Sequence, residues 1–175
     1  MNGEIRRSVI AGSWYPGNPR VLKADIQAFF DKAPDVKIEG EIAGLVAPHA
    51  GYVYSGQVAA YAYKSIIGQV YDAVILIGPS HRSLFRGVSV YDQGGYETPF
   101  GVVPVSKELA QKMMAFNPVI ANIPSAHAQE HSLEIQLPFL QAALGKFPFV
   151  PLVMGDQNRQ TCIQLAEAIF HAIKD

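Results

Sequence analysis

Two histidines directly follow short apolar runs of the kind that form buried strands. His49 comes after residues 41–47 in a Pro-His-Ala-Gly string, and His81 comes after residues 73–77 in a Gly-Pro-Ser-His-Arg string. Ligands of open α/β sheets bind beyond the carboxyl ends of the strands, so two such side chains can converge on one point. Neutral imidazole is the commonest side-chain ligand of transition metals and suits iron, copper and zinc. The pattern predicts that His49 and His81 hold a metal ion; the plainer alternative is that each is an ordinary loop residue.

A second group of metal-ligating residue types lies in one short stretch, where His127 precedes Glu130 and His131. This stretch leads into a predicted helix, so capping of free backbone N–H groups by Glu130 and Ser132 is the simpler role. Alternatively, Glu130 or His131 is a third metal ligand, or a residue that contacts the ligands without binding the metal itself.

Four further residues near these motifs have the chemistry of a substrate pocket: Trp14, Tyr54, Ser80 and Arg82. Aromatic side chains with polar tips can stack on a planar substrate, although half-buried packing explains them equally well. An arginine beside His81 is suited to anchoring a carboxylate or a phosphate. We therefore expect these residues to line the substrate side of the predicted metal site.

The remaining reactive residues and motifs do not indicate a second kind of site. The pattern predicts a structural or surface role for His171 within the last helix, and a packed thiol for Cys162. The chain has no P-loop, dinucleotide fingerprint, paired cysteines or nucleophile elbow. Covalent hydrolysis is therefore not expected.

Strands and helices alternate along the chain, which is typical of a layered α/β fold with a largely parallel or mixed sheet flanked by helices in three layers. The run at 73–77 is continuous and β-branched, so we expect a central parallel strand covered on both faces. Residues 92–99 are expected to form a polar loop. Apolar periodicity and capping signals predict helices at residues 18–33, 57–67, 106–116, 132–144 and 158–173, and strands at residues 41–47, 73–77, 87–91, 101–105 and 149–154.

Composition narrows the class of protein. The 175 residues suit one domain over residues 1–175, with 49% hydrophobic and only 17% charged residues. This composition excludes a disordered chain and a basic nucleic-acid arm, and a net charge of −1 argues against nucleic-acid binding. The single cysteine indicates a reducing compartment, and the absence of a long apolar run or signal sequence predicts a cytoplasmic protein away from the membrane. The low charge also suggests apolar surface that a partner or a second copy covers, and a homo-oligomer is expected.

Five strings together resemble the Memo family in order and spacing over nearly the whole chain. They lie at residues 11–16, 47–56, 78–81, 96–99 and 130–134. The resemblance implies the α/β fold of class III extradiol dioxygenases, which use a non-haem iron held by two histidines and a carboxylate. For Memo proteins themselves, the resemblance implies a metal site of two histidines and a cysteine that binds iron(II) or copper and has redox activity. The family histidines fall on His49 and His81, and the pocket tryptophan falls on Trp14.

The resemblance extends over roughly the first three-fifths of the family's usual length. The part that would contain the cysteine ligand has no counterpart here, and Cys162 lies in the wrong region to replace it. Two imidazoles alone hold a metal weakly, so weak or absent metal binding is expected unless another residue contributes.

Two functions follow from these observations, with metal-dependent hydrolysis by a bound hydroxide as a third option. The first is a metal-dependent, dioxygenase-like oxidoreductase acting on a small-molecule or peptide substrate. The alternative is a non-catalytic module that recognises a peptide or a companion protein in a modification system. The resemblance also implies a radical-SAM protein as companion.

Overall fold

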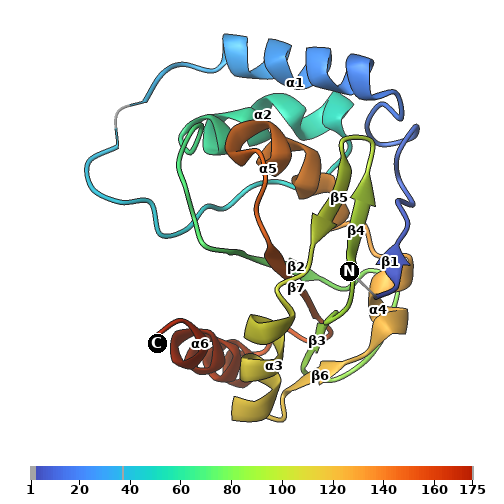
Figure 1. Ribbon diagram of the computed structural model, residues 1–175, viewed down its shortest axis with the longest axis vertical. Coiled ribbons are helices and arrows are strands. Elements are labelled where there is room, and N and C mark those ends of the chain that lie inside the picture. The colour runs from blue at the N-terminus through green and yellow to red at the C-terminus, as the bar shows by residue number, and fades with distance from the viewer. Residues whose placement is uncertain (1–2, 37, 175) are drawn as a thin grey trace.

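A four-stranded mixed sheet forms the middle layer of the protein (Figure 1). The computed structural model describes residues 3–36 and 38–174. β2 and β7 pair in parallel, β7 and β3 antiparallel, and β3 and β6 in parallel. In spatial order the strands are β2 (Val74–Pro79), β7 (Phe149–Met154), β3 (Val88–Val90) and β6 (Ile120–Asn122).

The alternating side chains of β7 divide the interior into two apolar cores. Phe149 and Val153 belong to the core with α1, α2 and α5, whereas Val150 and Leu152 belong to the core with α3 and α6. This three-layer α/β arrangement confirms the fold class that the sequence predicts. The long helices are α1 (Pro19–Lys32), α2 (Tyr52–Lys64), α3 (Lys107–Phe116), α5 (Leu137–Leu144) and α6 (Arg159–Ile173).

A small second sheet corrects the expectation of a polar loop at residues 92–99. It consists of β1 (Ile5–Arg6), β4 (Gly95–Thr98) and β5 (Gly101–Pro104), with β4 in the centre. Tyr96 and Thr98 are buried on one side of β4. The alternation of apolar and polar residues in β4 is not evident in the sequence, because the strand is short and contains one glycine and one charged residue.

The expected strand at residues 41–47 does not form; these residues have no regular structure. Their backbone pairs with no strand of the described sheets, although the edge strand β2 is bonded only to β7. Val46 is accordingly almost fully exposed. Apolar composition alone does not make a strand when its hydrogen-bond partner is missing.

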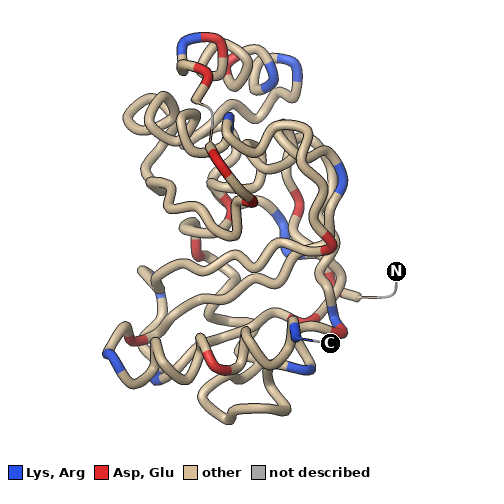
Figure 2. Tube along the Cα trace, turned by 90° about the vertical axis from the view of Figure 1, so that its left-hand side faces the viewer, with Lys and Arg blue, Asp and Glu red and all other residues tan. Residues whose placement is uncertain are grey.

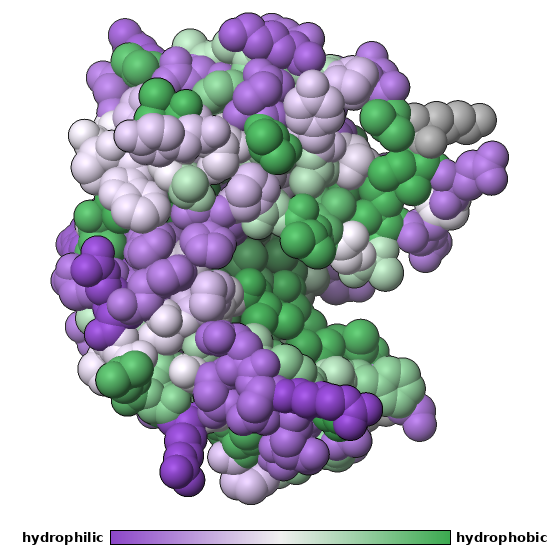
Figure 3. Space-filling model, turned by 180° about the vertical axis from the view of Figure 1, so that it is seen from behind, coloured by the Kyte–Doolittle hydropathy of each residue, from purple (hydrophilic) through white to green (hydrophobic). Residues whose placement is uncertain are grey.

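The predicted central strand, β2, lies instead at the edge of the sheet. Val74 and Leu76 pack against one core and Ile75 against the other, but Ile77 is 44% exposed. In Figure 1, β2 is drawn toward the back, and the rear view in Figure 3 shows a hollow with apolar walls. The composition of β2 is that of a strand covered on both sides, whereas its position leaves one backbone edge free.

Other elements differ from the prediction mainly at their ends. Asn18 caps α1 through its Oδ1 atom, as predicted. α2 begins at Tyr52 rather than at residue 57, and the helix predicted over 132–144 has two parts, with Pro138 in the first turn of α5. The first part is the short helix η1 (Glu134–Gln136). The pattern gave no signal for β6 or for the short helix α4 (Pro124–Ala128).

Over residues 3–36 and 38–174, no helix has both the length and the apolar character needed to cross a membrane. Positive and negative residues are intermixed along the chain in Figure 2, and their numbers nearly balance, with a net charge of −1.

The free edge of β2 is where we expect two copies of the chain to meet. Antiparallel pairing of two β2 strands would satisfy both edges, and a net charge of −1 gives little repulsion between copies. Ile77→Lys should shift the protein from dimer to monomer in light scattering at tens of micromolar. Val21→Lys, on the outer side of α1, is the matched control and should leave the mass unchanged. A wild-type monomer at all concentrations would contradict this expectation.

Gly78 in β2 permits close contact with the segment that carries the second group of candidate ligands. A Cβ at this position would lie 2.7 Å from Ser132 Oγ and 2.8 Å from Leu133 Cδ2. Gly78→Ala should therefore lower the free energy of unfolding by about 1–3 kcal/mol, measured by urea denaturation. Gly44→Ala is the control, because nothing lies within 4 Å of its added Cβ. Equal stability of the two variants would show that this contact does not matter.

Candidate metal centre

His49 and His81 come together although they are far apart in the chain. His81 follows the end of β2 by two residues, and His49 lies in the loop that enters α2. The centroids of their rings are 5.2 Å apart. Metal–nitrogen bonds are about 2.0–2.1 Å long, so rings at this separation can share one ion. The sequence predicts that these two residues lie close together, and in the fold their rings do so.

His131 adds a third imidazole to this pair. Its ring stacks on that of His81 with centroids 4.5 Å apart, and it lies 6.3 Å from the ring of His49. Nitrogen or oxygen atoms of His81, Glu130 and His131 all lie within 4.8 Å of one another, which is close enough to surround a metal ion. Glu130 and His131 therefore lie at the same place as the loop of His81, which follows β2.

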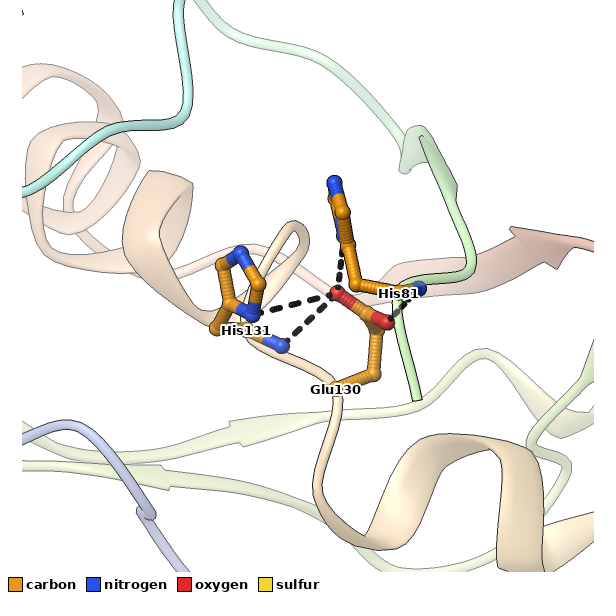
Figure 4. Close-up of side chains that lie close together, drawn as sticks. All are labelled: His81, Glu130 and His131. Atoms are coloured by element: carbon orange, nitrogen blue, oxygen red, sulfur yellow. Dashed lines mark hydrogen bonds and ion pairs between the residues drawn. The ribbon is translucent and has the colours of Figure 1, made fainter. Parts of the chain in front are cut away.

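Glu130 lies beneath the rings of His81 and His131 and accepts hydrogen bonds from several N–H groups (Figure 4). Its Oε1 accepts from the backbone N–H groups of His131 and Ser132, each at 2.9 Å, and lies 2.9 Å from His81 Nδ1. Its Oε2 accepts from the backbone N–H of His81 at 2.5 Å. The capping role predicted for Glu130 is thus present, and the same carboxylate also holds His81.

One nitrogen in this group is left without a hydrogen bond. His131 Nδ1 is buried and has no hydrogen-bond partner among the described residues, because the nearest carboxylate oxygen, Oε1 of Glu130, is 3.5 Å away. In Figure 4 the second ring nitrogens of His81 and His131 lie on the sides away from Glu130. A buried nitrogen without a partner, in a group of imidazoles, fits residues that hold a transition metal.

The electrostatic environment keeps two of the imidazoles in the form that binds metal. Burial lowers the pKa of His49, and the neighbouring His81 lowers it further. Burial likewise lowers the pKa of His131, against the opposing effect of Glu130. Burial alone would raise the pKa of Glu130, but the N–H groups of His81 and Ser132 outweigh it and lower the pKa to about 2. The site is thus built from a carboxylate and neutral imidazoles.

A cavity of about 400 Å³ lies directly beside His131 and has in its wall Trp14 and Arg82, two of the four residues expected on the substrate side. The Trp14 ring lies 4.4 Å from that of His131. Tyr54 is 84% exposed and lies outside this wall, and the Ser80 hydroxyl donates to the Ser83 carbonyl at 2.7 Å. The full lining is Val9, Ile10, Trp14, Arg82, Gln129 and His131.

The remaining histidines and the cysteine lie outside the cluster. His127 is fully buried, and its ring nitrogens lie 2.6 Å from Tyr96 Oη and 2.9 Å from Ser89 Oγ, so both are already engaged. The ring of His171 stacks on Phe116 at 4.4 Å, in keeping with its predicted structural role. Cys162 is exposed, which corrects the expectation of a packed thiol. The buried stripe of α6 runs through other positions of the helix, so the thiol faces outward.

A buried ion pair that the sequence analysis did not find supports the segment behind the cluster. Arg6 Nη1 pairs with Glu134, and Arg6 Nη2 donates to the Glu130 carbonyl at 2.5 Å. Glu134 also accepts from the N–H groups of Val9 and Ile10 and from the Tyr15 hydroxyl. No signal in the sequence connects Glu134 with Arg6.

Fold and site together define an α/β protein with a histidine cluster at the carboxyl end of one sheet strand. The family model for Memo-like proteins matches residues 6–175. A MEMO1 family protein of Methanothermobacter thermautotrophicus is 35% identical over 98% of this chain and 64% of its own length. Relatives from Thermoplasma volcanium and Thermotoga neapolitana are each 36% identical over 97% of this chain, and 63% and 65% of their own lengths.

The chain belongs to the Memo family, which confirms the resemblance drawn from its motifs. It spans about 64% of the length of the first of these relatives. The activity, substrates and partners of a whole family member are therefore matters for proposal.

The buried Arg6–Glu134 pair predicts a strong effect on stability and on its dependence on pH. Burial would raise the pKa of Glu134, but Arg6 outweighs it and holds the pKa below 4.5. A carboxyl with a lowered pKa in the folded state stabilises the fold above its unfolded pKa, and this stability is lost as the pH falls. Glu134→Gln should cost about 3–5 kcal/mol at neutral pH, because it leaves Arg6 buried and unpaired.

Urea denaturation between pH 7 and pH 2 measures both effects. Below pH 4.5, Glu134→Gln should flatten the fall in the free energy of unfolding by up to about 1.4 kcal/mol per pH unit, the value for one proton. Glu97→Gln is the control, because it breaks the exposed pair that Glu97 forms with Arg7. Such pairs contribute about 0–1 kcal/mol. Similar losses in both variants would refute the importance of the buried pair.

Proposed function

We propose that the protein holds an iron(II) or copper ion with His49, His81 and His131 as imidazole ligands. The observation that carries this proposal is the convergence of the three rings, with centroid separations of 5.2, 4.5 and 6.3 Å. His131 supplies the third ligand that two imidazoles need for a well-held ion. A reduced metal at this point would supply the activation of dioxygen that the dioxygenase-like fold suggests.

The cavity beside His131 would hold a planar or anionic substrate, either a small molecule or a group on a peptide. Trp14 offers an aromatic face and Arg82 a positive charge, while Val9 and Ile10 exclude water from the wall. His131 belongs to both the cavity wall and the histidine cluster, so a molecule bound there lies next to the proposed metal. These residues would bind and orient the substrate rather than exchange protons with it.

A non-catalytic binding module is the second candidate, and a second cavity supports it. This cavity of about 610 Å³ lies between α1 and the start of α2, with Trp14, Tyr15, Phe29 and Tyr52 in its wall. An aromatic groove of this size would suit a segment of a peptide or of a companion protein. A cytoplasmic radical-SAM protein is the companion that we propose for a modification system.

Metal content and thermal stability test the proposed site. Iron(II) added anaerobically at a hundredfold excess over Kd should stabilise the fold by about 2.7 kcal/mol, which is a Tm increase of roughly 5–10 °C. His49→Ala, His81→Ala and His131→Ala should each remove most of the increase. His171→Ala is the matched control and should retain it, because that ring lies on α6 against Phe116.

An increase that survives all three ligand substitutions would place the metal elsewhere and refute the site. Oxygen uptake by the iron-loaded protein then separates the two candidate functions. Turnover of dioxygen supports the oxidoreductase, and bound iron without oxygen uptake supports the binding module.

A further inference from the structure

We infer that Glu130 is the positioning residue of the proposed metal centre: it fixes the proton of His81 on Nδ1 and leaves Nε2 free as the ligand atom. This inference rests on the proposed function. It assigns Glu130 a place behind the ligands rather than among them.

The argument begins with the chemistry of the two groups. An ionised carboxylate only accepts hydrogen bonds, and a neutral imidazole carries one N–H and one bare nitrogen. His81 Nδ1 lies 2.9 Å from Glu130 Oε1, so the nitrogen facing the carboxylate must be the one that carries the proton. The bare nitrogen is then Nε2, which in Figure 4 points away from Glu130.

The carboxylate is itself held firmly enough to impose this choice. The side chain of Glu130 is almost fully buried, and two backbone N–H groups donate to the same Oε1 atom that faces His81. Its Oε2 accepts from the backbone N–H of His81. Glu130 therefore forms hydrogen bonds with both the backbone and the ring of His81, which fixes the orientation of the imidazole as well as its tautomer.

The same hydrogen bonds argue against Glu130 as a metal ligand. Oε1 already accepts from, or faces, three nitrogens at 2.9 Å, which uses the lone pairs directed toward the rings. His131 Nδ1, at 3.5 Å, is beyond hydrogen-bond distance of that oxygen. Of the two rings beside it, Glu130 therefore forms a hydrogen bond with that of His81 only. Carboxylates that support metal-bound histidines in this way typically affect metal affinity by about 10–100-fold.

The tautomer of His81 can be read directly in the metal-free protein. Long-range ¹H–¹⁵N NMR on ¹⁵N-labelled wild type should show the His81 proton on Nδ1 and a bare Nε2. In Glu130→Gln the amide offers N–H groups of its own, so the Nδ1–H preference should be lost. Glu97→Gln, which removes a distant exposed carboxylate, should leave the His81 signals unchanged.

Iron(II) affinity, measured by anaerobic calorimetry, provides the second readout. Glu130→Gln should raise the Kd by about 10–100-fold. Glu130→Asp keeps the carboxylate and should recover part of the affinity. The Glu97→Gln control should bind iron as the wild type does. If Glu130→Gln fails to fold, the wild-type tautomer and the Glu130→Asp protein still decide the matter.

The outcomes separate this inference from the proposed function. A wild-type His81 with its proton on Nε2, or unchanged iron affinity in a folded Glu130→Gln, would overturn the positioning role even if iron binds at the three histidines. An Nδ1–H tautomer that depends on Glu130, in a protein that binds no iron, would support the positioning role and overturn the metal proposal.

Discussion

The histidine cluster depends on the hydrogen bonds of one buried segment, residues 130–136. Ser132 Oγ donates to the Pro79 carbonyl at 2.9 Å, which holds the loop of His81. Gln136 Nε2 donates to the Pro48 carbonyl at 3.1 Å, which holds the loop of His49. Both histidine loops are therefore attached to a single stretch of chain, and that stretch also carries His131. Because buried polar groups are costly to leave unpaired, these contacts fix the distances among the three rings.

Two carboxylates in this segment stabilise different parts of the molecule. Glu130 faces the ligand side and binds N–H groups of the His81 loop, whereas Glu134 faces the N-terminal segment and pairs with Arg6. Arg6 links them again by donating to the Glu130 carbonyl. The N-terminal segment that contributes Val9, Ile10 and Trp14 to the cavity is thereby attached to the residues beneath the histidines. The same buried hydrogen bonds and ion pair therefore hold both the cavity wall and the candidate metal ligands.

The histidine cluster lies next to the edge strand of the sheet, where another chain could pair. His81 lies two residues beyond β2, the edge strand, so the candidate metal ligands are close to the open side of the sheet. The curated relatives are longer than this chain, which spans about 64% of one of them. A chain that pairs with β2 would therefore lie beside the histidines as well as against the exposed apolar surface.

The sequence by itself determined the layered α/β fold and the family. It also predicted that His49 and His81 meet, and their rings do lie 5.2 Å apart, although the strand expected before His49 does not form. These depend on local signals: apolar periodicity, capping residues and histidines placed directly after apolar runs. Only the tertiary structure decided that β2 lies at an edge, that residues 41–47 form no strand, and that Arg6 pairs with Glu134. It also decided that His131 joins the cluster while His127 is engaged by Tyr96 and Ser89. The physical reason is that strand pairing, buried ion pairs and hydrogen-bond saturation depend on which distant groups become neighbours, and no local pattern records that.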